Sequence, residues 1–298
     1  MELRHLRYFL AVAEEGNVTR AAARLHISQP PLSQQIKDLE QMLGVPLFDR
    51  STQGMTLTAA GQAFLAEARH TLQAAEQAMQ TAVRAARGET GSLRVGFTSS
   101  AAFNPVVAGT LRAFRQRWPG VHVVLEEANS TRLTEGLHAQ TLDAAFLRPA
   151  ATALPDLDVL RFKDERMKAV LPSTHPLASR KRIALAQLAA DDFVLFPRSV
   201  GLSLHDAIIG ACHAAGFEPR LELEVPQLSS VINLVAAGMG VSVVPASLSQ
   251  VQVQGVCHLD ISGPAPLATL GLAVRQGAQR TPTVRHLLEV ARQVGKQA

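Results

Sequence analysis

The chain has few of the residues and segments that mark secreted or membrane-bound proteins. Among 298 residues there are two cysteines, one tryptophan and one tyrosine. No apolar run approaches the roughly 18 residues needed to cross a bilayer, so we predict no membrane partner. Cys212 and Cys257 form neither a CxxC pair nor a metal-ligand spacing. We interpret both as small apolar side chains, with a redox pair as the alternative.

The short motifs of common enzyme classes are also missing. The sequence contains no GxSxG elbow, no P-loop and no HExxH zinc motif, and its ten histidines are scattered without metal-ligand spacing. Gly238-Met239-Gly240 is interpreted as a helix-to-strand turn. We therefore expect a protein that is not an enzyme, with no catalytic residue, no metal and no cofactor. An α/β enzyme is an alternative without a candidate nucleophile.

Targeting signals are absent from the first residues. A short apolar patch is followed by Glu14 and Glu15, and no small-residue cleavage site comes after it. This is not the pattern of a signal peptide, so we expect the protein to stay in the cytoplasm.

The net charge of +4 does not by itself indicate a nucleic-acid partner. Residues 1–90 hold nine Lys/Arg and nine Asp/Glu, so the whole excess lies in the rest of the chain. Only the local placement of Arg20, Arg24, Lys37 and Arg50 suggests contact with a polyanion.

Residues 17–50 contain two short helical patterns close together. The first covers about 18–25, with Asn17 as an N-cap residue. The second starts near Ser28 and has Pro30 and Pro31 in its first turn, where a missing amide donor costs little. A compact pair of this kind is typical of a helix-turn-helix, in which the second helix enters the major groove. An ordinary surface helix pair is the alternative.

The second of these helices is amphipathic. Its apolar stripe consists of Leu32, Ile36, Leu39 and Leu43. The opposite face is polar and is formed by Pro30, Ser33, Gln34, Lys37 and Gln41. We predict that this polar face is the surface that reads DNA.

Segments on either side complete the unit. A helical stripe from Leu3 to Ala13 stops at Gly16, which suits a helix end. After the helix pair, 47–48 and 55–57 look like two short strands around a polar tip. That hairpin would be a wing, from which Arg50 and Gln53 could reach phosphates or a minor groove. A hairpin with a solvated tip is the alternative.

The segment 1–61 resembles the winged helix-turn-helix of LysR-type transcriptional regulators. The likeness runs from Leu6-Arg7-Tyr8-Phe9 through Ser28-Gln29-Pro30-Pro31-Leu32-Ser33 to Leu57-Thr58-Ala59-Ala60-Gly61. Gln34 is a departure, because many members carry arginine there. The resemblance implies binding to double-stranded DNA, and the expected contacts are Ser28, Gln29, Pro30, Pro31, Ser33, Gln34, Lys37, Arg50 and Gln53.

Residues 58–87 form a long alanine-rich pattern without proline. Apolar and small residues recur at alternating spacings of four and three from Gly61 through Leu72 and Met79 to Ala86. A sustained repeat of this kind predicts a coiled-coil seam. In the resembling family this is a dimerising linker helix, and the resemblance implies a homo-oligomer of four chains, built as a dimer of dimers. A helix packed only on its own domain is the alternative.

The rest of the chain alternates strands and helices after the glycines at 88 and 91, which predicts two α/β units with parallel sheets. A single strand is predicted at 267–274. The resemblance adds the topology: a two-lobed effector domain like a periplasmic solute-binding protein. The predicted fold class is thus α/β, with a winged helix-turn-helix (1–58), a linker helix (59–88) and an effector domain (92–298). Lobe I would comprise about 92–162 and 267–298, and lobe II about 163–266.

Polar residues follow the predicted strands at successive carboxyl ends, where α/β sheets bind ligands. Ser99 and Ser100 follow the first strand, Ser130 opens a helix after the second, and Arg148 follows the third. In the second unit, Ser203 lies where 197–203 opens a helix. Serines at helix starts can be simple caps, and Arg148 could be a solvated strand end.

The chain is most similar to the LysR subgroup that responds to aromatic acids and muconates. In that subgroup, positions matching Ser99, Ser130 and Arg148 contact the effector. We therefore expect a transcriptional regulator controlled by a small organic carboxylate, with RNA polymerase as a further candidate partner. A small-molecule binding protein without gene control is the alternative, and residues 17–50 argue against it.

Overall fold

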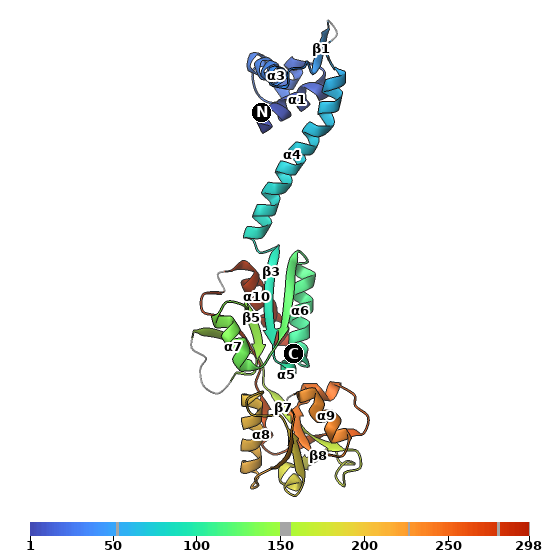
Figure 1. The fold of residues 1–298 in the computed structure, drawn as a ribbon, viewed down its shortest axis with the longest axis vertical. Coiled ribbons are helices and arrows are strands. Elements are labelled where there is room, and N and C mark those ends of the chain that lie inside the picture. The colour runs from blue at the N-terminus through green and yellow to red at the C-terminus, as the bar shows by residue number, and fades with distance from the viewer. Residues whose placement is uncertain (52–53, 150–155, 226, 279–280, 298) are drawn as a thin grey trace. The chain divides into compact units, whose positions relative to one another are not determined.

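The computed structural model describes residues 1–51, 54–149, 156–225, 227–278 and 281–297. Capping residues begin several of its helices and glycines end others. The chain divides into two units, Met1–Arg84 and Ala85–Ala298 (Figure 1). No helix in the described ranges is both long enough and apolar enough to cross a bilayer.

Unit 1 contains three helices, a hairpin and most of a long fourth helix. The helices are α1 (Leu3–Glu15), α2 (Val18–Arg24), α3 (Gln29–Leu43) and α4 (Ala59–Ala86), and the hairpin strands are β1 (Phe48–Ser51) and β2 (Gly54–Leu57). Asn17 caps α2 as predicted, accepting a hydrogen bond from the Arg20 amide at 3.1 Å. Ser28 has the extended backbone of a cap, but its hydroxyl makes no capping bond.

The core of unit 1 is aromatic and lies where the helices meet the hairpin. The ring of Phe9 in α1 lies 5.2 Å from that of Phe48 in β1 and 5.0 Å from that of Phe64 in α4. Glu40 Oε1 accepts the backbone amides of Leu47 and Phe48, at 2.8 and 3.1 Å. These two hydrogen bonds fix the turn from α3 into the hairpin.

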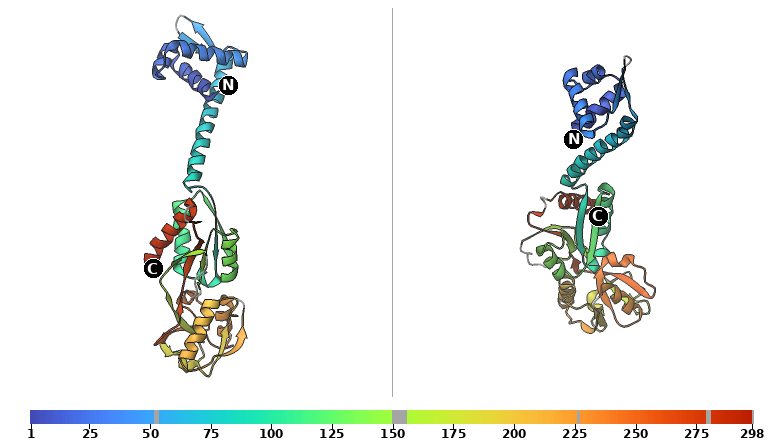
Figure 2. Two further views of the ribbon diagram at one scale, coloured as in Figure 1. Left: turned by 90° about the vertical axis from the view of Figure 1, so that its left-hand side faces the viewer. Right: turned by 45° about the horizontal axis from the view of Figure 1, so that its top comes forward.

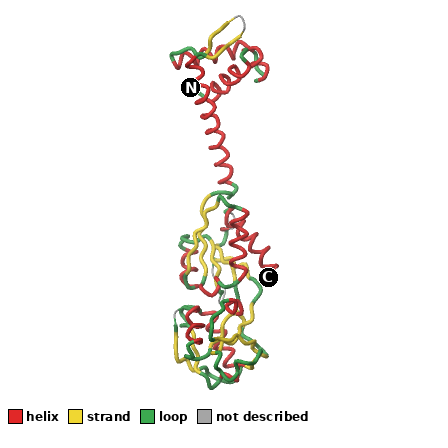
Figure 3. The backbone as a smooth tube through the Cα atoms, turned by 90° about the vertical axis from the view of Figure 1, so that its right-hand side faces the viewer, coloured by secondary structure: helices red, strands yellow, loops and turns green. Residues whose placement is uncertain are grey.

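Two expectations for these helices need correction. Leu32, Ile36 and Leu39 are buried as predicted, whereas Leu43 is 38% exposed because α3 has run past the core. Helix α4 is continuous (Figure 3). The first half of its predicted seam packs against the chain's own core, so it is not available to a second chain. Ala68 is buried in the core of unit 1, and Leu65 and Leu72 pack against that core. The second half is open, with Met79 55% and Val83 48% exposed.

Unit 2 begins with lobe I, a five-stranded sheet in the order β4-β3-β5-β14-β6. The strands are β3 (Gly91–Phe97), β4 (Val121–Glu127), β5 (Ala144–Leu147), β6 (Leu157–Arg161) and β14 (Gly271–Arg275). Its helices are α5 (Ser99–Ala102), α6 (Pro105–Arg117), α7 (Ser130–His138) and α10 (Pro282–Gln297).

Helices cover both faces of this sheet, as the left view of Figure 2 shows. Phe146 of β5 faces a core shared with α6 and α10, whereas its neighbours Ala145 and Leu147 face α7. The alternation follows from the two-residue period of a strand. Strands buried on both faces explain why 144–147 is uniformly apolar.

Lobe II has a mixed sheet and a separate pair of strands. The mixed sheet joins β7 (Glu165–Pro172), β8 (Arg182–Ala184), β11 (Ser242–Pro245), β12 (Val256–Ser262) and β13 (Leu267–Ala268). The pair is β9 (Asp192–Leu195) with β10 (Arg220–Glu224), and the helices are α8 (Leu202–Ala214) and α9 (Leu228–Ala236). Two short 3-10 turns, η1 (Leu185–Leu188) and η2 (Ala246–Gln250), complete the lobe.

The strand predicted at 267–274 is wrong as a single element. Leu267 and Ala268 pair with β7 in lobe II, and β14 resumes at Gly271 in the sheet of lobe I. The expectation of parallel sheets also fails here, because β14 runs antiparallel to β5 and β6. The reason is topological: strands β3, β4 and β5 run towards lobe II, so a chain returning from lobe II must enter in the opposite direction.

Candidate functional site

One cavity of about 430 Å³ lies between the lobes of unit 2. Its volume falls in the range of pockets that enclose small molecules. All five side chains predicted to hold an effector line it: Ser99, Ser100, Ser130, Arg148 and Ser203. The structure therefore brings together residues that are spread over more than a third of the sequence.

Sheet topology explains this convergence. Strands β4 and β5 both pair in parallel with β3, which lies between them. Their carboxyl ends therefore meet at one edge, and the residues that follow each strand come together there. Ser203 arrives from the opposite side, in the first turn of α8.

Among the described residues, Arg148 is the only arginine or lysine that lines this cavity, and other groups of the protein accept most of its N–H donors. Its Nε donates to Ser100 Oγ at 2.9 Å, and Nη1 donates to the carbonyl of Thr269 at 3.1 Å. Nη2 donates to the carbonyl of Ser100 at 3.1 Å and to Glu165 Oε1 at 2.9 Å. Burial lowers the pKa of the guanidinium, and the neighbouring carboxylate opposes that shift.

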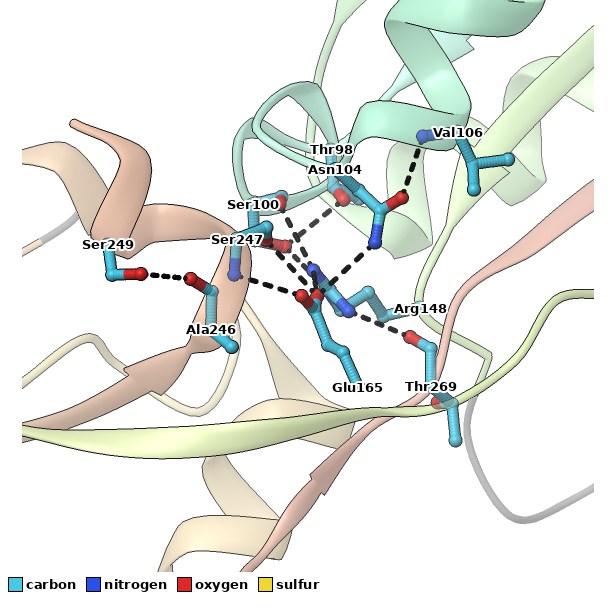
Figure 4. Close-up of polar contacts among 10 residues, drawn as sticks. All are labelled: Thr98, Ser100, Asn104, Val106, Arg148, Glu165, Ala246, Ser247, Ser249 and Thr269. Carbon is cyan, nitrogen blue, oxygen red and sulfur yellow. Dashed lines mark hydrogen bonds and ion pairs between the residues drawn. The ribbon is translucent and has the colours of Figure 1, made fainter. Parts of the chain in front are cut away.

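Glu165 links this arginine to lobe II (Figure 4). Its Oε2 accepts the Ser247 amide at 3.0 Å, and its Oε1 accepts the Ser247 hydroxyl at 3.2 Å. The amide of Asn104, in lobe I, also donates to Oε1 at 3.5 Å. The charge expected to attract an effector is thus largely compensated within the protein, and Arg148 joins the two lobes.

Besides the short α5, three helices begin at the cavity, and the free amides at their starts supply further positive potential. Asn129 caps α7 through the Arg132 amide at 2.9 Å. The first residues of α8 and α9 follow Gly201 and Gln227, neither of which makes a side-chain capping bond. Free amides at a helix start attract anions.

Several residues of the lining were not predicted from sequence, and three of them have side chains that bear on the choice of ligand. Phe196 supplies an aromatic surface, Gln227 an amide, and Glu127 a negative charge at the end of β4. Glu127 and Gln227 follow the rule used for Ser130, a polar residue at a strand end or helix start. Phe196 also follows its strand, β9, directly. The partner Glu165 left no such signal, because it lies on β7 and meets Arg148 only in the folded protein.

The predicted DNA-reading face is exposed along α3. Ser28, Gln29, Pro30, Pro31, Gln34 and Lys37 are open to solvent, and Ser33 is half-buried. Gln29 donates to the Ser33 hydroxyl at 2.7 Å, and Gln34 donates to Asp38 at 2.8 Å. Lys37 forms no ion pair with another described residue, so its charge is available to a phosphate.

The other basic residues of this region differ from one another. Arg24 pairs with Glu14 at 2.9 Å and with Glu15 at 3.3 Å, and these bonds raise the pKa of its guanidinium. The charge of Arg24 is therefore largely neutralised on the side of α1. Arg50 is exposed on β1, opposite Met55, whereas Gln53 lies outside the described residues.

Comparisons with known proteins agree with both halves of the chain. Residues 3–62 match a family described as "Bacterial regulatory helix-turn-helix protein, lysR family", and residues 86–296 match "LysR substrate binding domain". The regulator YnfL of Escherichia coli (strain K12) is 42% identical over 297 residues, covering 98% of this chain and 99% of that protein. TfdS of Cupriavidus pinatubonensis is 38% identical over 292 residues, with 98% of each covered.

Solved structures show the same likeness. CbnR, a LysR family transcriptional regulator, superposes with a TM-score of 0.88 at 34% identity, covering 98% of this chain and 100% of that one. Full-length CbnR in complex with its target DNA gives 0.86 at 33% identity, with 99% and 100% covered. The curated relatives are named as transcriptional regulators and not as enzymes, which agrees with the prediction from sequence.

Proposed function

Because this chain belongs to the LysR family of DNA-binding transcriptional regulators, we propose that a small organic carboxylate in the inter-lobe cavity controls its activity. The observation that carries the proposal is the convergence of Ser99, Ser130 and Ser203 with the starts of α7, α8 and α9 around one cavity. Hydroxyls and free amides are the donors that a carboxylate needs.

The division of roles follows from which donors the protein leaves free. Ser100 and Arg148 are largely bonded to each other, to Thr269 and to Glu165. Ser99, Ser130 and Ser203, with the amides at the starts of α8 and α9, would therefore hold the carboxylate. Phe196 would pack against the apolar body of the ligand, which allows the ligand to be aromatic.

For DNA we propose that α3 enters the major groove and that the hairpin lies beside it. The observation that supports this is the polar face of α3, which is exposed while Leu32, Ile36 and Leu39 hold the helix on the core. Gln34, Ser33 and Gln29 would contact base edges, Lys37 and Arg50 phosphates, and Ser28, Pro30 and Pro31 the backbone beside them.

We also infer a homo-oligomer built as a dimer of dimers. Two separate apolar surfaces lack a partner among the described residues. One is the stripe of Met79 and Val83 on α4, and the other is the edge strand β4 of lobe I, on which Val124 and Leu125 are exposed on opposite faces. Two surfaces on one chain allow two kinds of pairing, and two winged units can then match two half-sites of an operator.

Calorimetric titration of the full-length protein with benzoate and with cis,cis-muconate tests the effector. Ser99→Ala and Ser203→Ala should each weaken binding by roughly 10-fold, since a hydrogen bond to a charged group contributes about 1.5–3 kcal/mol. Ser249→Ala, which removes a hydroxyl outside the cavity lining, is the matched control. Equal affinity in all variants would refute the assignment of this cavity and leave the family membership intact.

A further inference from the structure

The short helix α5 touches both the cavity and the inter-lobe polar cluster. Ser99, its first residue, lines the cavity. Ser100 is buried and bonds to Arg148 through both its hydroxyl and its carbonyl oxygen. Ala101 is buried in the core of lobe I, which fixes the helix to that lobe.

Phe103 ends this helix and packs in an unexpected direction. It belongs to lobe I by sequence, yet its side chain packs against the hydrophobic core of lobe II. Its near neighbours Ala101 and Val106 are instead buried in the core of lobe I. Helices α5 and α9 are in direct contact, which places this packing at the junction of the lobes.

The next residue adds a polar link in the same direction. Asn104 accepts the amide of Val106 at 3.0 Å and so caps α6 in lobe I. Its side-chain amide donates to Glu165 at 3.5 Å, and Glu165 in turn accepts two bonds from Ser247 of lobe II (Figure 4). Residues 99–104 therefore carry a cavity residue at one end and two contacts towards lobe II at the other.

We propose that Phe103 is a positioning residue that couples the cavity to the arrangement of the lobes. Ser99 and Phe103 are four residues apart, so they lie about one helical turn from each other on the same side of α5. A ligand that forms a hydrogen bond with Ser99 shifts α5 or reduces its motion. Because packed cores change between discrete arrangements rather than deform smoothly, the ring transmits that shift to lobe II. Only the ligand step rests on the proposed effector.

The coupling can be tested without an effector by amide hydrogen exchange of the full-length protein. Phe103→Ala should speed exchange in α9 by about tenfold, because the lost contact lowers the local opening free energy there. The β7–β12 strands of lobe II should keep their protection. Phe103→Leu, which refills most of the space, should restore α9 to within about twofold of the wild type.

Phe162 provides the matched control. It is also half-buried and lies where the chain passes from β6 of lobe I to β7 of lobe II. However, it packs against the core of lobe I, with its ring 6.3 Å from that of Phe146. Phe162→Ala should speed exchange in lobe I and leave α9 unchanged. Wild-type exchange of α9 in Phe103→Ala would overturn the coupling, as would an equal effect of Phe162→Ala. Failure of carboxylates to bind would instead refute the effector and leave this result intact.

Discussion

Arg148 and Glu165 form an ion pair across the junction of the lobes, 2.9 Å between Nη2 and Oε1, with side chains only 2% and 16% exposed. The two residues come from different elements: Arg148 follows β5 in lobe I, and Glu165 begins β7. Arg148 was expected to attract the effector, but through this ion pair it holds the two lobes together.

Removing Arg148 should therefore destabilise unit 2 in addition to any effect on ligand binding. Arg148→Ala leaves the carboxylate of Glu165 largely buried without its partner, which costs roughly 3–5 kcal/mol. Arg94→Ala is the control, because the Arg94–Asp143 pair is more exposed and such pairs contribute about 0–1 kcal/mol. Urea unfolding of the full chain, followed by the fluorescence of Trp118 in unit 2, measures both. An equal loss in the free energy of unfolding for both variants would mean that the buried pair contributes no more stability than the exposed pair.

Lys37→Ala should weaken binding to every DNA sequence and reduce the slope of log affinity against log salt by about one unit. Gln34→Ala should instead relax the preference at one or two base pairs, at a cost of roughly 1–3 kcal/mol on the correct site. Footprinting at several salt concentrations separates the two. Lys296→Ala removes the same charge from the exposed face of α10 and should change neither quantity; a salt slope that Lys37→Ala leaves untouched would misplace the helix.

Met79→Glu should weaken the assembly, because it places a charge on the open half of α4 where a second copy of the chain is expected. Gln77→Glu is the control, since it adds the same charge at an exposed position on roughly the opposite side of the helix from Met79. Leu72 is less suitable, because it packs against the core of its own unit. Sedimentation at micromolar concentration compares the variants, and a wild-type monomer would contradict the prediction.

Gly61→Ala should destabilise unit 1 strongly. A Cβ at this position would lie 2.0 Å from the carbonyl oxygen of Leu47, which is backbone and cannot move aside. Gly210→Ala, in α8, meets nothing within 4 Å and should stabilise unit 2 by about 0.5–1 kcal/mol. Thermal unfolding distinguishes the two signs, and a Gly61→Ala variant as stable as the wild type would show that the approach of α4 to Leu47 is wrong.

Local pattern was enough for the elements whose ends depend on neighbouring residues. Asn17 and Gly16 set helix ends through bonds within four residues, and Ser99, Ser100 and Ser130 follow their strands within three residues. Sequence failed where tertiary contacts decide. Periodicity cannot reveal that Leu43 lies beyond the core, or that the chain changes sheet between Ala268 and Gly271.

The same limit applies to the site. Polar residues at strand ends can be recognised one by one, but the partner of Arg148 depends on where lobe II is placed. Phe103 gave no signal either, because an aromatic residue at a helix end does not reveal which core it joins. In both cases the missing information is which distant surface a side chain meets.

The return of the chain to lobe I has a consequence for biosynthesis. Strand β14 lies between β5 and β6, so the sheet of lobe I stays incomplete until residues 271–275 have been made. Lobe II is continuous in sequence, and its first and last strands pair at Arg166 and Leu267. Although domains usually fold in order of synthesis, the second lobe here can finish before the first. A released chain that ends at Leu270 should therefore resist protease in lobe II, while β3, β4 and β5 are still cleaved because β14 is missing. In the full chain, folding of lobe II places residue 270 close to the sheet of lobe I, which shortens the loop that β14 must close.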